Sequence, residues 1–334
     1  MMVNKVAFLA TVYRHLEAFH LPYIKLLQQK GCEVHAYAYP DQGKIEVQNK
    51  GVICHDIQFK RTPFHVNNMK ALMMLFQSFK VEQFDLIHVH TPVASVLGRI
   101  AAKMSGNPFV IYTAHGFHFF TGAPILNWLL YYPVERLLSR WTDYLITINE
   151  EDYQRAKRFP VRREVLYVQG VGIDINQFLL LNEMEIRKQK RKELGIREND
   201  FVILSVAELN KNKNIVQLID SVDYMRKKLI NKTMMLSVKC LLAGDGEDRE
   251  RLIEKVNELG LSEHFCFLGF RKDVPELMAV SDVVVLLSKR EGLPKSLMEA
   301  LAAGKPIVTT NVRGNRDLVE DGVNGYVVKV GDVQ

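Results

Sequence analysis

Two glutamates, Glu291 and Glu299, lie eight positions apart in the stretch KREGLPKSLMEALAAGKPIVTT, residues 289–310. Glu291 precedes a Gly-Leu-Pro turn, and Glu299 lies in an apolar segment with helical spacing. Carboxylates accept hydrogen bonds from hydroxyl groups, so the pair suits the sugar and ribose hydroxyls of a nucleotide sugar. The spacing alone is also compatible with a surface glutamate and an ordinary helical glutamate. The Gly-Leu-Pro turn and the following AAGKPIVTT favour a ligand site.

A strand, a turn and a helix must position these carboxylates. The apolar run 282–288 predicts the strand, and the helix is expected over about 295–303. Pro294 suits the first helical turn, where a missing N–H costs nothing, and Gly292 allows a ligand to approach the backbone. Free helical amides at the carboxyl end of a strand can bind a diphosphate. The amides expected to do so belong to Ser296, Leu297 and Met298.

Both halves of the chain alternate short apolar runs with amphipathic segments, which predicts parallel sheets covered by helices on both faces. The expected strands are 6–10, 33–39, 85–90, 109–115, 144–149, 164–169, 201–208, 236–244, 265–269, 282–288, 306–310 and 325–330. Helices are expected at 16–30, 65–80, 92–104 and 125–140. A charged helical stretch without a strand separates the two series. We therefore expect an α/β protein of two doubly wound domains, 1–176 and 199–334, joined by a linker over 177–198.

Size and composition agree with two soluble domains. The 334 residues exceed one ordinary core, and 48% are hydrophobic while 25% are charged. No apolar run approaches the roughly 18 residues of a membrane-spanning helix. The four cysteines form no C-x-x-C pair, which favours reduced thiols in a cytoplasmic protein. The last expected strand lacks its covering helix, which predicts a truncated C-terminal domain.

The net charge of +6 is concentrated in the first half of the chain. Residues 1–175 hold 19 basic and 14 acidic residues (+5), and the remainder holds 25 and 24 (+1). A basic first half suits an anionic partner such as a phosphate-bearing lipid or a membrane surface. Solvated surface charge explains the small excess equally well.

Longer stretches of the sequence resemble one enzyme family. Residues 265–328, which include FLGFRKDVPELM and EDGVNGYVV, are similar to the donor-binding half of the retaining glycosyltransferases of family 4. In the first half, HVHTPVASVLGRIAAK, VIYTAHGFHFF and YLITINEEDYQRA resemble the bacterial exopolysaccharide and capsule branch. The resemblance covers nearly the whole chain. It implies the GT-B fold, in which two Rossmann-like domains face each other across a cleft.

The resemblance also implies an activity. A hexosyl or N-acetylhexosaminyl group would pass with retention from a nucleotide-diphosphate sugar, by default a UDP-sugar, to a lipid-linked saccharide. The reaction would belong to exopolysaccharide or capsule biosynthesis in the cytoplasm. The resemblance leaves peripheral contact with the inner membrane face open. No metal, no cofactor beyond the donor and no nucleic-acid partner are expected. The absence of any Asp-x-Asp disfavours a metal-bridged diphosphate.

Roles in donor binding follow by resemblance. Glu291 would contact the donor sugar, Glu299 the ribose and Lys213 the diphosphate. Where the family usually carries an arginine, this chain has Glu208. The lost charge-assisted contact costs about 1.5–3 kcal/mol unless Lys211 replaces it. The diphosphate loop would comprise Gly292, Leu293, Pro294, Lys295, Ser296 and Leu297.

The loops near the base follow from the same resemblance. Gly244 and Gly246 in LLAGDGED would let the backbone pass the base. Phe270 and Arg271 would close over it.

The first half supplies the remaining candidates. His115 in TAHG matches a histidine that the family places beside the donor sugar, which makes it a catalytic candidate with Glu291 and Lys213. On the same side, acceptor contacts are expected from Thr11, Arg14, His15, His90 and Thr91. Of these, Thr11, Arg14 and His15 stand where many relatives have a Gly-Gly pair. The aromatic segment 116–141 suits a membrane interface or a lipid-linked acceptor, and equally a packed core helix.

Two other functions remain open on the sequence. One is an enzyme resembling a nucleotide-sugar 2-epimerase, which would need no acceptor. The other is an inactive glycosyltransferase-like subunit that regulates a partner, which the departures at Glu208 and Thr11 keep open. An NAD-binding dehydrogenase is disfavoured, because no G-x-G-x-x-G follows the first strand.

Overall fold

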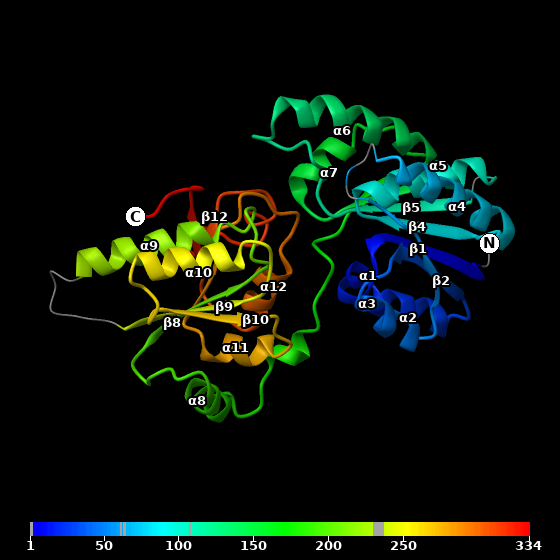
Figure 1. The fold of residues 1–334 in the computed structure, drawn as a ribbon. Helices are drawn as coiled ribbons and strands as arrows, with labels where there is room; N and C mark the ends of the chain where they lie inside the picture. Colours follow the sequence, from blue (N-terminus) through cyan, green and yellow to red (C-terminus); the bar gives the residue numbers. More distant parts are fainter. Residues whose placement is uncertain (1–2, 61, 63–64, 107, 230–236) are drawn as a thin grey trace. The chain divides into compact units, whose positions relative to one another are not determined.

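The computed structural model describes residues 3–60, 62, 65–106, 108–229 and 237–334. The chain forms two compact units, Met1–Val171 and Gly172–Gln334, called unit 1 and unit 2 below. Figure 1 shows a sheet flanked by helices in each of them. The expected strand at 236–244 begins on Leu236, which lies outside the described residues. No described helix is long and apolar enough to cross a membrane.

Unit 1 contains a parallel seven-stranded sheet of order β3-β2-β1-β4-β5-β6-β7. Its strands are β1 (Lys5–Val12), β2 (Glu33–Tyr39), β3 (Ile53–Asp56), β4 (Leu86–His90), β5 (Phe109–Ala114), β6 (Tyr144–Thr147) and β7 (Glu164–Tyr167). Its helices are α1 (Tyr13–Phe19), α2 (Leu21–Gln29), α3 (Gly43–Asn49), α4 (Asn67–Glu82), α5 (Pro92–Met104), α6 (Ile125–Leu138), η1 (Ser139–Trp141) and α7 (Glu150–Ala156). The strand order reverses between β1 and β4, where doubly wound sheets bind ligands at their carboxyl ends.

Unit 2 repeats the topology with six parallel strands of order β10-β9-β8-β11-β12-β13. The strands are β8 (Phe201–Val206), β9 (Val238–Ala243), β10 (Phe265–Gly269), β11 (Val283–Leu286), β12 (Ile307–Thr310) and β13 (Gly325–Val328). The helices are η2 (Ile175–Phe178), α8 (Glu183–Glu193), α9 (Ile215–Leu229), α10 (Arg249–Glu258), α11 (Val274–Val280) and α12 (Lys295–Ala302). Here the order reverses between β8 and β11.

Each sheet has a core on both faces, as the apolar runs predicted. In β1, Val6 and Phe8 pack with α1–α3, whereas Ala7 and Leu9 face the cluster that includes α4 and α5. In unit 2, α9 and α10 cover one face, and α11 and α12 cover the other (Figure 1). The alternation of side-chain direction along each strand therefore explains why whole strands are apolar.

Two local features differ from the sequence-based prediction. Strand β3 was not predicted, since its four residues, Ile-Cys-His-Asp, are too short and polar to stand out. The single helix expected over 16–30 is broken at His20, between α1 and α2. Pro22 explains the break, because it has no N–H to continue the helical ladder of α1.

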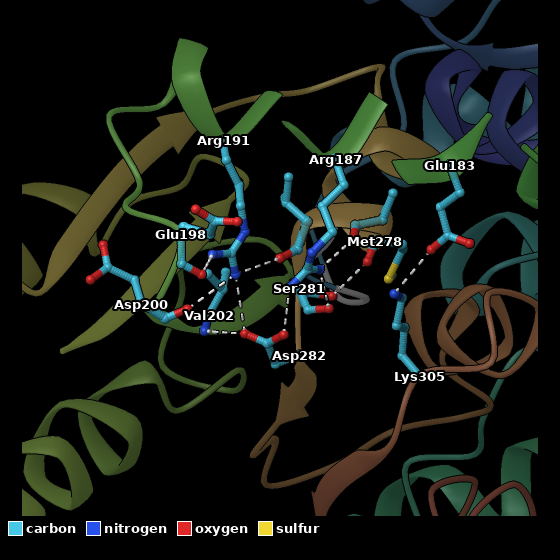
Figure 2. Close-up of polar contacts among 12 residues, drawn as sticks. Glu183, Arg187, Arg191, Glu198, Asp200, Val202, Met278, Ser281, Asp282 and Lys305 are labelled. Carbon is cyan, nitrogen blue, oxygen red and sulfur yellow. Dashed lines mark hydrogen bonds and ion pairs between the residues drawn. The ribbon is translucent and has the colours of Figure 1, made fainter. Parts of the chain in front are cut away.

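The segment 177–198, for which the sequence predicted a linker, contains α8 packed on unit 2 (Figure 2). Arg187 donates to the carbonyls of Ala279 and Ser281 and pairs with Asp282 at 2.7 Å. Arg191 donates to the carbonyls of residues 197, 198 and 200 and pairs with Asp282 at 3.3 Å. Two of the charged residues in this segment therefore attach the helix to the amino end of β11.

Candidate active site

The loops after β8 and β11 meet at the carboxyl end of the unit 2 sheet, where the strand order reverses. Lys213 Nζ lies 2.6 Å from Glu291 Oε1. Asn212 ties the same loops together, since its side chain donates to the Arg290 carbonyl at 2.9 Å and its own carbonyl accepts from Lys289 N–H at 2.8 Å. Two of the three predicted catalytic groups therefore form an ion pair at the switch point.

The start of α12 differs from the prediction. Pro294 is the N-cap rather than a first-turn residue, and Leu297 and Met298 donate their N–H groups to its carbonyl at 3.2 and 3.3 Å. An N-cap carbonyl accepts the first intrahelical bonds, so these two amides are not available. Among the described residues, the amides of Lys295 and Ser296 have no acceptor. Of the three amides predicted for the diphosphate, only that of Ser296 is free.

Glu299 lies on the buried side of α12. It is 8% exposed, and Lys295 Nζ lies 3.3 Å from its Oε1. Burial raises the pKa of Glu299, and the neighbouring Lys295 opposes that rise. Leu297 is fully buried in the core, so its side chain cannot contact a ligand.

The predicted glycines allow close contacts between loops. A Cβ on Gly244 (φ +149°) would lie 1.9 Å from the Ala207 carbonyl oxygen, and one on Gly246 would lie 2.4 Å from that of Leu209. Glycine is therefore required for the loops after β8 and β9 to pack backbone to backbone. Nearby, Gly292 is held against Gly314, where a Cβ would come within 2.2 Å of the Gly292 oxygen.

The remaining predicted donor-side residues are more exposed. Phe270 is 60% exposed and follows Gly269, whose carbonyl accepts from Gly244 N–H at 2.8 Å. The Arg271 guanidinium is bound by Asp273 and lies 3.5 Å from Glu193 of α8, so it helps to attach that helix. Both Glu208 and Lys211 have exposed side chains.

The sequence analysis missed several polar residues beside this loop. Arg313 is 4% exposed and donates from Nε to the Glu291 carbonyl at 3.1 Å. Asn315 is fully buried and donates to the Thr310 carbonyl at 3.1 Å. The signal was the run NVRGNR directly after the expected strand 306–310, because residues that follow a parallel strand lie at the ligand-binding edge.

In unit 1, the carboxyl end of β1 and the residue after β4 meet through two threonines. Thr11 N–H donates to Thr91 Oγ1 at 2.9 Å, and the two hydroxyls lie 2.8 Å apart. Thr91 has φ +59°, a conformation that is costly for a β-branched residue and is concentrated at functional sites. The structure thus brings together two of the predicted acceptor-side residues.

Four histidines form a cluster beside these threonines. His115 Nε2 lies 3.3 Å from both His15 Nε2 and His90 Nδ1, and His20 Nε2 lies 3.4 Å from His15 Nε2. Burial lowers the pKa of His115 to about 4 and also lowers the pKa values of the other three, with further lowering by neighbouring histidines. The cluster is therefore uncharged near neutral pH.

His20 was not predicted as a site residue. It reaches the cluster because the chain breaks at the α1–α2 junction, and Pro22 in HLPYI was the available signal. Arg14 lies at the start of α1, where its N–H donates to Asp41 and its side chain is exposed.

An apolar cavity of about 190 Å³ lies in unit 1 between α5, β5, α6 and the loop after β5. Its wall includes Tyr112, Leu130, Val134 and Glu135. The outer face of α6 is exposed and apolar over Ile125, Leu126, Leu129, Leu130, Val134 and Leu137. The cavity and this face are continuous, because Leu130 and Val134 belong to both. Part of the segment 116–141 is therefore packed in unit 1, and part of it is exposed to solvent.

Comparisons with known proteins define the class. The family model described as glycosyl transferases group 1 matches residues 186–334, and the model described as glycosyltransferase family 4 matches residues 23–177. The family 4 model lies mainly in unit 1, and the group 1 model lies in unit 2. The protein is a glycosyltransferase with the GT-B fold.

Individual relatives show which glycosyltransferases the chain is similar to. The chain is 41% identical to EpsD of Bacillus subtilis, a provisionally named glycosyltransferase, across 99% of this chain and 85% of EpsD. It is 31% identical to the Escherichia coli UDP-Gal:alpha-D-GlcNAc-diphosphoundecaprenol alpha-1,3-galactosyltransferase, across 80% and 68% of the two chains. CapM of Staphylococcus aureus, a capsular polysaccharide biosynthesis glycosyltransferase, is 28% identical across 92% and 80%. The chain belongs to this family of bacterial glycosyltransferases.

A solved structure agrees with the fold. HepE of Anabaena, crystallised with UDP-glucose, aligns with a TM-score of 0.79 at 24% identity, across 99% of this chain and 86% of HepE.

Proposed function

We propose that the protein transfers a hexosyl or N-acetylhexosaminyl group, with retention, from a UDP-sugar to a lipid-linked saccharide during exopolysaccharide or capsule assembly. The reaction would take place in the cytoplasm, at the inner membrane face. The observation that carries the proposal is the pairing of Lys213 with Glu291 beside the free amides at the start of α12. The UDP-sugar and diphosphoundecaprenol in the name of the E. coli relative, and the UDP-glucose bound to HepE, support the substrate classes.

In the proposed donor complex, the diphosphate binds Lys213 and the amides of Lys295 and Ser296. Glu291 then accepts hydrogen bonds from sugar hydroxyls and Glu299 from the ribose. Both carboxylates are nearly buried, so ligand contacts there are less weakened by water than on the surface. Lys213 has to leave Glu291 in order to bind the diphosphate. Donor binding therefore frees the Glu291 carboxylate.

Transfer with retention then needs no protein base. The bond from the anomeric carbon to the diphosphate oxygen breaks, and the acceptor hydroxyl forms its bond on the same face. Its proton passes to the departing diphosphate. Lys213 and the α12 amides stabilise the negative charge that grows on the diphosphate, a form of electrostatic catalysis. The protein also holds the two substrates in reacting geometry.

The lipid part of the acceptor is assigned to unit 1. An engineered protein cavity of about 150 Å³ holds benzene, so the unit 1 cavity has room for a comparable apolar group of the lipid chain. The exposed apolar face of α6 would lie in the membrane surface. Arg136 and Arg140 are exposed at the end of this helix and suit anionic phosphates.

Turnover with a synthetic acceptor tests the transferase function. UDP-sugars and a lipid-diphosphate-GlcNAc would be incubated with wild type, Glu291→Gln and the exposed control Glu263→Gln, and UDP and the product anomer would be followed. Wild type and Glu263→Gln should transfer with retention, and Glu291→Gln should lose about 100-fold or more in rate. An epimerised donor or free UDP without acceptor would support the epimerase alternative. A folded chain that turns over no UDP-sugar would support the inactive subunit.

Vesicle flotation tests the lipid surface. Leu129→Asp on α6 should weaken binding to anionic vesicles, while Ile45→Asp, which changes a similarly exposed residue on α3, should not. Equal binding by the two variants would remove the membrane role of α6 and leave the donor site untouched.

A further inference from the structure

The strongest unexplained feature of the molecule is the cluster of His15, His20, His90 and His115. One ring nitrogen from each lies within 4.8 Å of the others. The close contacts are 3.4 Å (His20 to His15), 3.3 Å (His15 to His115) and 3.3 Å (His115 to His90). The residues come from the start of α1, the α1–α2 junction and the ends of β4 and β5.

Hydrogen bonding alone does not account for these contacts. A neutral imidazole nitrogen has either one N–H or one lone pair, which points outward in the ring plane. Nε2 of His15 and Nε2 of His115 nevertheless each have two close nitrogen neighbours. Three contacts along four single-valent nitrogens therefore exceed the two hydrogen bonds that the set can make.

The orientation of His90 points the same way. Its Nδ1 faces the cluster, whereas its Nε2 is buried without a hydrogen-bond partner. A buried polar atom without a partner costs about 1–3 kcal/mol. The His90 ring is therefore oriented so that Nδ1 contacts the cluster, although this leaves Nε2 without a hydrogen bond.

A tetrahedral metal ion satisfies all four nitrogens at once. Zinc binds histidine at about 2.0–2.1 Å, and ligands at that distance in a tetrahedron lie about 3.3–3.4 Å apart. Three of the six edges match this length, and the other three nitrogen pairs lie within 4.8 Å. We propose that unit 1 binds a Zn²⁺ ion through Nε2 of His15, His20 and His115 and Nδ1 of His90.

The surroundings support a metal rather than an anion. Neutral imidazole is the form that binds metals, and burial keeps these rings neutral. A second group that could hold a metal ion comprises Glu33, His35 and Glu82. Unlike the histidine cluster, this group contains carboxylates. Lys5 already pairs with both of its carboxylates, so a cation is present there.

The ion would have a defined local effect. It would fasten the α1–α2 junction to the ends of β4 and β5, next to the strained Thr91. With Nε2 of His115 on the metal, its proton stays on Nδ1, so that nitrogen can only donate. This inference revises the expectation of a metal-free protein. It does not depend on the proposed transferase function, because metal binding is measured without donor or acceptor.

Cobalt substitution tests the site. The full chain would be stripped with a chelator, checked for folding by circular dichroism and titrated with Co²⁺. We expect one equivalent to bind with the intense visible absorption of four-coordinate cobalt, and Zn²⁺ to displace it and raise the melting temperature. No uptake by the folded chain, or the weak absorption of six-coordinate cobalt, would overturn the proposal.

Matched variants locate the ion. His20→Asn should lose most of the bound metal and the cobalt spectrum, whereas His35→Asn, in the second histidine-containing group, should keep both. Mass spectrometry of the untreated variants should show the same difference, with most of the metal lost from His20→Asn and retained by His35→Asn. Full cobalt stoichiometry and an unchanged spectrum in His20→Asn would contradict the assignment, as would their loss in folded His35→Asn.

Discussion

The carboxyl ends of the two sheets share one topology but carry different chemistry. In unit 1 the reversal of strand order is surrounded by uncharged histidines that are buried or half-buried, whereas in unit 2 it is surrounded by a lysine, glutamates and free helical amides. Neutral imidazoles suit a metal ion, and cationic and acceptor groups suit the diphosphate and hydroxyls of a nucleotide sugar. On this account the same scaffold would receive different ligands through residues that follow its strands.

The largest expected effect concerns a buried ion pair in unit 1. Arg99 is 1% exposed, pairs with Glu135 at 2.8 Å and stacks on Tyr112. Arg99→Ala leaves Glu135 buried without its partner, so we expect a loss of about 3–5 kcal/mol in unfolding free energy, measured by urea denaturation. The double variant Arg99→Met/Glu135→Leu should recover much of that loss. A single-variant loss below about 1 kcal/mol would show that water reaches Glu135.

The next effect lies in unit 2 and concerns turnover. Lys213→Met keeps the length of the side chain but removes the charge proposed to stabilise the departing diphosphate. The transfer rate should fall by about 100-fold or more. The unfolding free energy should also fall, because the nearly buried Glu291 loses its charged partner, so rates are compared in protein shown to be folded. Lys227→Met, which changes a lysine that is 65% exposed on α9, is the control. Comparable rates for the two lysine variants would contradict the role of Lys213.

The two sites were not equally predictable, because their residues are distributed differently along the chain. Glu291 and Glu299 belong to one strand–loop–helix segment, so their spacing was visible in the sequence. The histidine cluster joins four separate positions. The sequence placed His15, His90 and His115 on one side, but only the fold shows that their rings are in contact. His20 was missed entirely, since its position depends on the helix break before Pro22.

The fold itself was largely predictable from periodicity. Parallel strands buried on both faces give strong apolar runs, and only the short, polar β3 escaped notice. The attachment of α8 could not be predicted. Asp282, which pairs with both arginines, and the carbonyls that accept from Arg187 lie about 90 residues further along the chain.

A smaller effect concerns the pH dependence of stability. Burial raises the pKa of Glu299 in the folded protein, so its ionised form costs stability. That contribution favours folding below the ordinary carboxyl pKa and is lost as pH rises through the folded value. Glu299→Gln stays neutral and should be more stable than wild type at about pH 8, with the difference shrinking towards about pH 4. Urea unfolding at both values measures this, and a difference of the opposite sign at about pH 8 would show that Lys295 outweighs burial.

The smallest effect concerns a surface pair. Lys227 pairs with Asp223 at 2.6 Å one helical turn away. Because Lys227 is exposed, Lys227→Ala should change the unfolding free energy by no more than about 0.5 kcal/mol. A change above about 1 kcal/mol would contradict the small contribution expected of an exposed pair.

The most direct test of the central claim is calorimetric titration of UDP into wild type, Lys213→Met and Lys227→Met. The account predicts that UDP binds wild type and Lys227→Met alike. Lys213→Met should bind about 10- to 100-fold more weakly, since one charge-assisted contact contributes about 1.5–3 kcal/mol. Equal affinity in all three proteins, or no binding of UDP to the folded wild-type chain, would contradict the assignment of the donor site to the carboxyl end of the unit 2 sheet.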